Sequence, residues 1–261
     1  MKISFKWIGG ATWMLHIDDI TIACDPVLCS KGHIQDYKYF KTERLNEPIF
    51  NEAELKSVNL WLLTHNHEDH IDEYGIKMIN ESSAIIAHKS LKLYFKNDKY
   101  SSVQILKCNQ STTLVLSGIK ITIKAIPAIH AKKQALGKVI GNGNGYFLEI
   151  DKDGEKYFIY ATGDSVFNKN IQKYFGSSKI DLIIVNAGAA MVGESFLSKI
   201  IGRITNNIDD VKNMISELHP KLLIPVHWGT FSHYSETINK NSFIDYNNVK
   251  LLNVGETVNL L

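Results

Sequence analysis

One heptapeptide, residues 64–70 (THNHEDH), constrains the fold of this chain more than any other stretch. It contains three histidines and directly follows residues 58–63, an apolar run that is typical of a buried strand. Neutral imidazole and carboxylate are common ligands of zinc and similar first-row ions. In extended backbone His65 and His67 point to the same side, because side chains alternate with a period of two. The heptapeptide therefore predicts a metal site at the end of a strand.

The alternative interpretation is a polar loop in which histidines have gathered by chance. Histidine is scarce in this chain, with 10 in 261 residues. Three of them directly after a strand, in a window that also holds a central acid, favour the metal site.

The composition is that of an ordinary globular protein and limits the partners. Hydrophobic residues make up 44% and charged residues 21% of the chain, and we expect a single domain over residues 1–261. The net charge of +2 creates no strong field for nucleic acid or an anionic membrane. No uncharged apolar run approaches the length of a membrane span. We therefore expect neither a nucleic-acid partner nor a membrane span.

Cysteine usage and the N-terminus predict a cytoplasmic protein. The cysteines are Cys24, Cys29 and Cys108, an odd number without a Cys-x-x-Cys spacing, so we expect free thiols in a reducing compartment. Charge interrupts the apolar residues at the N-terminus, which is unlike a signal peptide. The sequence leaves the oligomeric state open, a homo-oligomer included.

Strand and helix patterns alternate along the chain. Residues 2–25 fit three strands joined by tight turns. Further strands are expected at 84–88, within 103–129 with turns at 108–109 and 117–118, at 146–150, 157–161, 179–186 and 221–226, and as two short pieces within 249–261. Helices are expected at 74–80, 91–95 and 207–218, the last capped by Asn206 or Asn207 and stopped by Pro220. This alternation predicts a layered α/β architecture.

Residues 27–57 show little periodicity, which is typical of a lid or a loop insertion. His33 in this segment could reach an active site, although an exposed loop histidine is the simpler interpretation. Directly before the segment, Asp25-Pro26 has the composition of a turn.

Three further polar clusters follow strand patterns later in the chain. His130 comes just past residues 119–129, Asp164 follows the strand at 157–161, and His227 follows the strand at 221–226. Each cluster alone could be a turn or a surface position. His233 lies close enough to His227 in sequence to stand at the rim of a site, or simply on the surface.

The pattern His-x-His-x-Asp-His after an apolar strand resembles the signature of the metallo-β-lactamase fold superfamily. Pro-Ala-x-His at 127–130, Gly-Asp-Ser at 163–165 and His-Trp-Gly-Thr-Phe at 227–231 resemble its later motifs, in order. The last is similar to the branch that includes N-acyl-phosphatidylethanolamine-hydrolysing phospholipase D and ascorbate-6-phosphate lactonase-like proteins. The resemblance implies an α/β fold, a four-layer αββα sandwich of two mixed β-sheets flanked by helices.

Carried over position by position, the resemblance implies two adjacent metal sites. The first ion would be held by His65, His67 and His130, the second by Asp69, His70 and His227, with Asp164 bridging the two. Asp25 would lie beneath these sites and steady the ligands, as carboxylates behind metal-bound histidines do. The ions would be two divalent cations, with Zn²⁺ favoured, and Mn²⁺ or Fe²⁺ also fit such ligands.

The resemblance also implies the chemistry, a metal-dependent hydrolase that cleaves a small ester, lactone or phosphodiester. A hydroxide bridging the two ions would be the nucleophile, so no catalytic serine or cysteine is needed. Asp69 would orient this hydroxide or accept its proton, and His33 or His233 could supply the acid for the leaving group. The implied partner is a small-molecule substrate.

Some classes within the superfamily are disfavoured and others stay open. Asp164 stands where β-lactamases of class B1 carry cysteine, and the short segment between Asp164 and His227 leaves no room for the inserted domain of the RNA-processing nucleases. A metal-binding sensor or an iron redox protein on the same fold is an alternative, as is a nuclease acting on small RNA or DNA. The sequence does not specify the substrate, the metal or the leaving-group acid.

Overall fold

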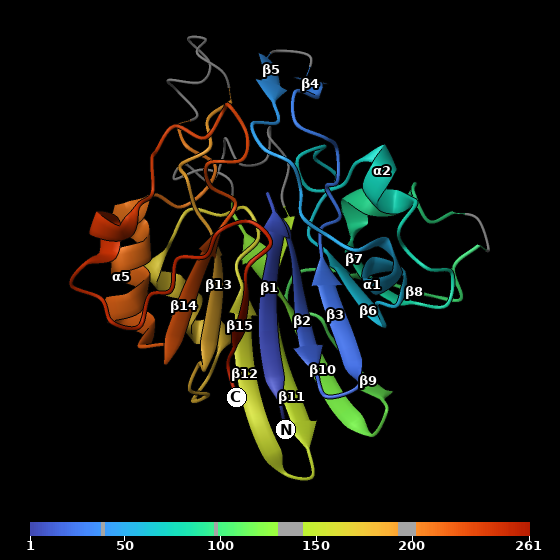
Figure 1. Cartoon of the computed structure of the whole chain (residues 1–261). Coiled ribbons are helices and arrows are strands. Elements are labelled where there is room, and N and C mark those ends of the chain that lie inside the picture. The colour runs from blue at the N-terminus through green and yellow to red at the C-terminus, as the bar shows by residue number, and fades with distance from the viewer. Residues whose placement is uncertain (38–39, 97–98, 130–142, 193–201) are drawn as a thin grey trace.

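The computed structural model describes residues 1–37, 40–96, 99–129, 143–192 and 202–261, which form two β-sheets packed face to face (Figure 1). The first sheet has the order β15-β1-β2-β3-β6-β7-β8. Its strands are β1 (Ile3–Gly9), β2 (Thr12–Ile17), β3 (Ile20–Cys24), β6 (Leu60–Leu63), β7 (Ala84–His88), β8 (Ser102–Leu106) and β15 (Thr257–Asn259). Strands β1 to β3 form the expected antiparallel meander, and β3, β6, β7 and β8 run parallel.

The second sheet has the order β14-β13-β12-β11-β10-β9. Its strands are β9 (Ser111–Leu116), β10 (Ile119–Ala128), β11 (Gly143–Lys152), β12 (Glu155–Ala161), β13 (Leu182–Asn186) and β14 (Leu222–Val226). Strands β9 to β12 are antiparallel, whereas β12, β13 and β14 are parallel. Both sheets are therefore mixed.

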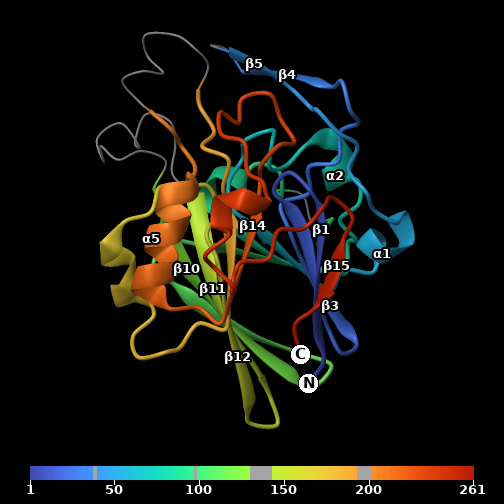
Figure 2. The same ribbon diagram turned by 60° about the vertical axis from the view of Figure 1, so that its left-hand side comes forward.

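Helices cover the outer face of each sheet, which gives four layers (Figure 2). Helices α1 (Glu52–Lys56) and α2 (Glu73–Ile76) lie over the first sheet, and α5 (Ile208–Leu218) lies with the 3₁₀ helix η2 (Lys169–Tyr174) over the second. Short 3₁₀ turns η1 (Lys89–Leu91) and η3 (Lys240–Phe243) complete the described helices. No helix in these described ranges is long and apolar enough to cross a bilayer. The predicted four-layer fold is confirmed.

Alternating side chains build the core between the sheets. In β10, Ile119, Ile121 and Ile123 are fully buried while their neighbours along the strand are exposed or half-buried, as expected for a strand with one face on a core. Large rings such as Trp13 and Tyr146 fill the space between the sheets. Apolar residues under the helices form separate clusters on the outer faces.

The segment at residues 27–57 is more ordered than its sequence pattern indicates. It contains the two-stranded hairpin of β4 (Ile34–Tyr37) and β5 (Phe40–Glu43), followed by helix α1. Figure 1 places this hairpin above the edge where strands of both sheets end. Within the hairpin, Gln35 and Thr42 are buried although both strands are short and polar. The hairpin is therefore packed onto the molecule by its polar side chains.

Two predictions of secondary structure are wrong. Residues 91–95 are not a helix, because only Leu91 is fully buried there and one apolar contact does not offset the cost of helix nucleation. Residues 249–261 form one strand, β15, instead of two. Val249 makes only an isolated bridge to Leu223, and Gly255 turns the chain with φ of 85°. The helix at 207–218 is confirmed, with Asn207 as its N-cap.

Candidate metal centre

Four buried side chains meet at the edge where strands of both sheets end. Asp69 and His70 follow β6, Asp164 follows β12, and His227 follows β14. One possible ligand atom from each lies within 4.8 Å of those from the other three. Each of these residues is at most 3% exposed. The structure thus brings together four of the residues that the sequence predicts as metal ligands.

The backbone at these strand ends adopts conformations that few residues tolerate. His227 has a φ of 60°, and its N–H donates to Gly10 O of the first sheet at 3.1 Å. Gly163, directly before Asp164, has a φ of 57°, and a Cβ there would lie 2.7 Å from Asn144 O. Non-glycine residues at positive φ cost on the order of 1–3 kcal/mol and cluster at functional sites. The backbone at His227 therefore supports a functional role for this side chain.

Asp25 lies beneath the cluster and orients His70. Its carboxylate accepts hydrogen bonds from the N–H of Thr64 at 2.7 Å and from the Thr64 hydroxyl at 2.5 Å. The remaining partner is Nδ1 of His70, which lies 2.7 Å from Asp25 Oδ2. With Nδ1 donating to this carboxylate, Nε2 of the neutral ring presents its lone pair to the cluster. Asp25 is thus more than a turn residue.

The carboxylate of Asp164 is the centre of the cluster. Its Oδ1 accepts a hydrogen bond from Nδ2 of Asn186 at 2.8 Å and lies 3.0 Å from His70 Nε2. His227 Nε2 lies 3.6 Å from the same oxygen and 3.4 Å from Asp69 Oδ2. Two carboxylates therefore share one buried histidine between them.

Several polar atoms of this cluster lack a hydrogen-bond partner, and these atoms test whether the residues fit a metal ion. Among the described residues, Asp164 Oδ2 and both ring nitrogens of His227 are buried without one. Leaving a buried polar group unpaired costs about 1–3 kcal/mol, so native proteins rarely do so. A cation would satisfy these lone pairs, and imidazole with carboxylate is the donor set of zinc, iron and manganese sites. The residues therefore fit a metal ion.

The charges of the cluster also suit a cation. Burial opposes the charge of Asp69, yet His227 and His233 hold the pKa of this carboxyl well below its usual range. Burial likewise opposes the charge of Asp164, and His227 with His70 lowers its pKa well below the ordinary value. Burial alone would lower the pKa of His70, but Asp164 and then Asp25 raise it well above the ordinary value. The site thus holds carboxylates that stay ionised and demand positive charge nearby.

His65 and His67 lie beside the four-residue cluster. Nε2 of His65 is 2.9 Å from Nδ1 of His67, and the His65 and His70 ring centroids are 4.1 Å apart. His65 is 2% exposed. The remaining predicted ligand, His130, lies outside the described residues. Ile129 directly before it accepts a hydrogen bond at 3.0 Å from the N–H of Val166, two positions after Asp164.

The β4–β5 hairpin reaches into this site with three polar side chains. The Tyr37 hydroxyl donates to Asp69 Oδ1 at 2.8 Å and accepts from the Asp69 N–H at 3.0 Å. Gln35 Nε2 donates to the neighbouring carbonyl of Glu68 at 2.7 Å. Thr42 Oγ1 lies 2.7 Å from Nδ1 of His233, whose Nε2 is 3.3 Å from Asp69 Oδ2. The hairpin therefore holds both oxygens of Asp69, one directly and one through His233.

Comparison with known proteins agrees with this geometry. The family described as Beta-lactamase superfamily domain matches residues 4–227. The chain belongs to this superfamily. A UPF0173 metal-dependent hydrolase from Alkaliphilus metalliredigens is 26% identical to it over 99% of this chain and 100% of the relative. The N-acyl-phosphatidylethanolamine-hydrolyzing phospholipase D 1 of Caenorhabditis elegans is 24% identical over 86% of this chain and 63% of its own length. The predicted resemblance is therefore confirmed.

Solved structures share the fold of this superfamily member. The possible metal-dependent hydrolase from Veillonella parvula superimposes with a TM-score of 0.80 at 20% identity, over 99% of both chains. At this identity the likeness concerns the fold alone. It agrees with the two mixed sheets and the outer helices described above.

The structure does not bring His33 to the cluster. The His33 ring packs edge-on against Tyr74, with ring centroids 6.0 Å apart. The backbone N–H of His33 donates to Ser30 O. No hydrogen bond or ion pair of the described residues joins the His33 side chain to the predicted ligands. His233, by contrast, faces Asp69 directly.

Sequence reasoning missed two side chains that contact the carboxylates of this superfamily member. Asn186 ends β13 and bonds Asp164, and Tyr37 bonds Asp69. The one sequence signal for Asn186 was its place at the end of an apolar strand, the same context that marks the histidines. Tyr37 sits among other aromatics in a segment without periodicity, so no local pattern distinguishes it.

Proposed function

We propose that this chain is a metal-dependent hydrolase that holds two divalent cations at the edge of its two sheets. The observation that carries the proposal is the buried cluster of Asp69, His70, Asp164 and His227, in which Asp164 Oδ2 and ring nitrogens of both histidines lack a hydrogen-bond partner. The first ion would be held by His65, His67 and His130, the second by Asp69, His70 and His227, with Asp164 shared between them. Zinc is favoured, and manganese or iron also suits these ligands.

Two dications at such a site supply a nucleophile from water near neutral pH and polarise the bond to be cleaved. The residues of the chain then control where protons go. Asp69 is ionised and fixed at both oxygens, so it can accept a proton or orient the nucleophile. Asp25 keeps the His70 ring in one orientation. No serine or cysteine nucleophile is required.

For the leaving-group acid, the geometry favours His233 over His33. His233 lies at the cluster, is largely buried, and has its Nδ1 next to the Thr42 hydroxyl. His33 contacts Tyr74 instead. A His233→Gln variant should therefore lose more activity on substrates with poor leaving groups than on p-nitrophenyl esters, and His33→Gln should behave as wild type on both.

The hairpin supports the proposal that residues 27–57 act as a lid on a single domain over residues 1–261. Its contacts with the site are polar and few, so the hairpin can move away at modest cost. Tyr37 and Phe40 stack with ring centroids 4.7 Å apart and form an aromatic wall beside His67. Such a wall would shape the entrance for a small-molecule substrate.

The substrate class is a small ester, lactone or phosphodiester, and two alternatives rest on the same ligands. An iron redox protein or metal sensor would bind metal without hydrolysing these bonds. A nuclease acting on small RNA or DNA would need a basic surface, and the net charge of +2 disfavours it. Metal analysis of protein purified without added metal separates iron from zinc. A panel of bis(p-nitrophenyl) phosphate, simple lactones and short oligonucleotides separates the hydrolytic classes.

Two substitutions test the proposal as a whole. Asp164→Asn and His67→Ala should each lower the bound metal per chain and reduce turnover to background. Asp19→Asn and His219→Asn make comparable changes at exposed positions and should leave both quantities unchanged. Full activity in either ligand variant would overturn the proposal.

A further inference from the structure

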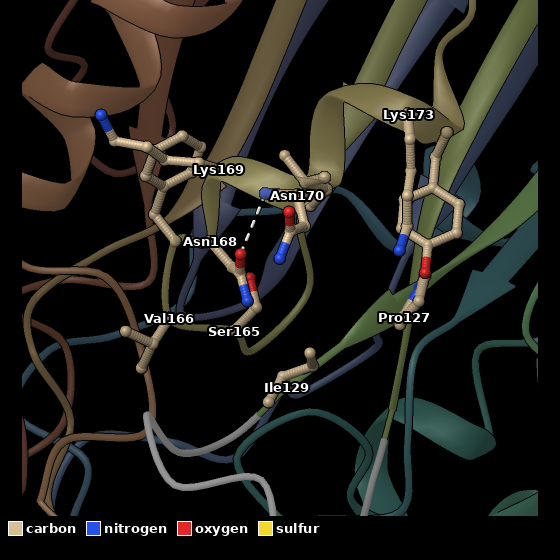
Figure 3. Close-up of a pocket in the computed structure, with 11 residues that line it drawn as sticks. Pro127, Ile129, Ser165, Val166, Asn168, Lys169, Asn170 and Lys173 are labelled. Atoms are coloured by element: carbon tan, nitrogen blue, oxygen red, sulfur yellow. Dashed lines mark hydrogen bonds between the residues drawn. The ribbon is translucent and has the colours of Figure 1, made fainter.

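A cavity of about 560 Å³ includes Ser165 in its lining. One wall is the end of β10 with Pro127 and Ile129, and the other is the segment from Ser165 to Tyr174 that contains η2 (Figure 3). Ser165 directly follows Asp164 in the chain. The volume lies in the usual range for small-molecule sites, roughly 300–1,000 Å³. The cavity is therefore large enough for part of a substrate whose reacting bond lies at Asp164.

The polar lining of this cavity is rich in hydrogen-bond donors. Figure 3 shows the side-chain nitrogens of Asn168, Asn170 and Lys173 directed toward Pro127 and Ile129. Oδ1 of Asn168 is already engaged, because it accepts from the Asn170 N–H at 2.9 Å. That bond leaves the Nδ2 donors of Asn168 for a ligand.

The charge of the lining is positive. The described part of the lining includes Lys169 and Lys173 and no aspartate or glutamate. Lys169 is neutralised by Glu217 at 2.7 Å, and Figure 3 shows it directed away from the cavity. Among the described residues no carboxylate pairs with Lys173, whose amine lies 5.2 Å above the Tyr174 ring. Lys124 lies 5.9 Å from the same ring and adds positive charge behind it.

Apolar side chains surround these donors. Pro127, Ile129, Val166 and Ile171 also line the cavity. A fully hydrated inorganic ion would gain nothing from such contacts. A ligand with an apolar body and an oxyanion head would bury the body against these residues and direct its charge at Lys173.

We propose that this cavity is a substrate subsite for an organic oxyanion, a phosphate, phosphonate or carboxylate attached to an apolar group. Lys173 and the two asparagines would bind the oxyanion, and the bond to be cleaved would extend past Ser165 to Asp164. This inference deepens the proposed function and rests on it for the reaction. The binding of the anion itself does not depend on turnover.

Calorimetric titration with phenylphosphonate, which contains no ester bond to hydrolyse, tests the subsite. We expect saturable binding to the protein as purified, weakened by about tenfold or more in Lys173→Met, since a charge-assisted hydrogen bond is lost. Lys169→Met removes the lysine that faces away and should change the affinity by less than about twofold. Asn170→Asp adds a negative charge to the lining and should also weaken binding. Absence of binding, or equal binding to Lys173→Met, would overturn the subsite.

Kinetics with two substrates separate this inference from the proposed function. In Lys173→Met the KM for mono-p-nitrophenyl glutarate, whose carboxylate is separate from its ester bond, should rise, while kcat/KM for neutral p-nitrophenyl acetate stays at the wild-type value. A wild-type protein that cleaves neither substrate yet binds phenylphosphonate through Lys173 would refute the hydrolase and retain the anion site. Equal KM for the glutarate ester in wild type and Lys173→Met would refute the anion site and retain the hydrolase.

Discussion

Replacing Tyr37 by phenylalanine removes one hydroxyl from the candidate site and little else. The ring that stacks on Phe40 remains, because the two planes meet at 3° and the contact does not involve the hydroxyl. The hydroxyl makes two short hydrogen bonds with Asp69, to Oδ1 at 2.8 Å and from the N–H at 3.0 Å, and a longer one to Gln35 Oε1 at 3.4 Å. Burial, and then the charge of Asp69, raises the pKa of Tyr37 well above its ordinary value, so the phenol remains a donor at neutral pH.

The expected loss of stability in Tyr37→Phe follows from the two hydrogen bonds with Asp69. A hydrogen bond to a charged group contributes about 1.5–3 kcal/mol, and Asp69 is too buried for water to replace the hydroxyl fully. We expect Tyr37→Phe to lower the free energy of unfolding by about 2 kcal/mol, which is roughly 4–8 °C in Tm for a chain of this size. Metal affinity or kcat should fall by about 10- to 100-fold, as for other groups that orient metal ligands.

Thermal unfolding, metal titration against a competing chelator, and steady-state kinetics together measure this prediction. Tyr94→Phe makes the same chemical change at a side chain that is 45% exposed and is the matched control. It should leave all three quantities at wild-type values. If Tyr37→Phe loses stability but keeps its metal affinity and kcat, Tyr37 packs the hairpin and does not position Asp69. If it loses nothing, the geometry of the hairpin over the site is wrong.

Three further predictions concern other parts of the molecule. Asp25→Asn should weaken metal binding by about 10- to 100-fold, because the His70 ring loses the acceptor that fixes it; equal binding in a chelator competition would refute that role. Burial and then Lys89 lower the pKa of His88 to about 4, below its value in the unfolded chain. As the pH is lowered, the unfolded chain therefore binds a proton before the folded protein does, and the free energy of unfolding decreases. Between pH 7 and 5 wild type should lose about 1–2 kcal/mol more than His88→Asn, allowing for solvent screening, and parallel denaturation curves would contradict this. A thiol reagent should react with Cys108 alone in the native protein and with three thiols after denaturation; rapid native reaction of a second thiol would contradict the burial of the other two.

The parts of the site that could be predicted from sequence are those whose residues form a recognisable pattern within a short stretch of chain. The heptapeptide at 64–70 joins a buried strand to ligand side chains within one turn of chain, so its role is visible without a fold. Asp164 and His227 are visible only as polar residues after apolar strands. They can be predicted to lie close together because the carboxyl ends of parallel strands lie at one edge of a sheet.

The parts that could not be predicted depend on contacts between distant segments. Tyr37 meets Asp69 across 32 positions, and Asn186 meets Asp164 across 22. Such hydrogen bonds leave no period in the sequence, because each needs only one suitable side chain at the right place. The helix expected at 91–95 does not form for a related reason. Its apolar residues have the spacing of a helix, but only Leu91 among them is fully buried against another part of the molecule.

Main-chain contacts between the two sheets fix the backbone at the strand ends of the candidate site, whereas the hairpin contacts the site through side chains. His227 N–H bonds Gly10 O, and Asn144 N–H bonds Thr64 O at 3.0 Å, so each sheet anchors a strand end of the other. A centre arranged in this way exists before a cation arrives, unlike a zinc finger, in which metal binding and folding are one event. Little ordering cost then remains for binding, and affinity depends on the ligand atoms and on the side chains that orient them, such as Asp25 and Tyr37. The side-chain contact of Tyr37 is accordingly the adjustable part of the site, and substrate-linked changes should occur in the hairpin while the strand ends stay in place.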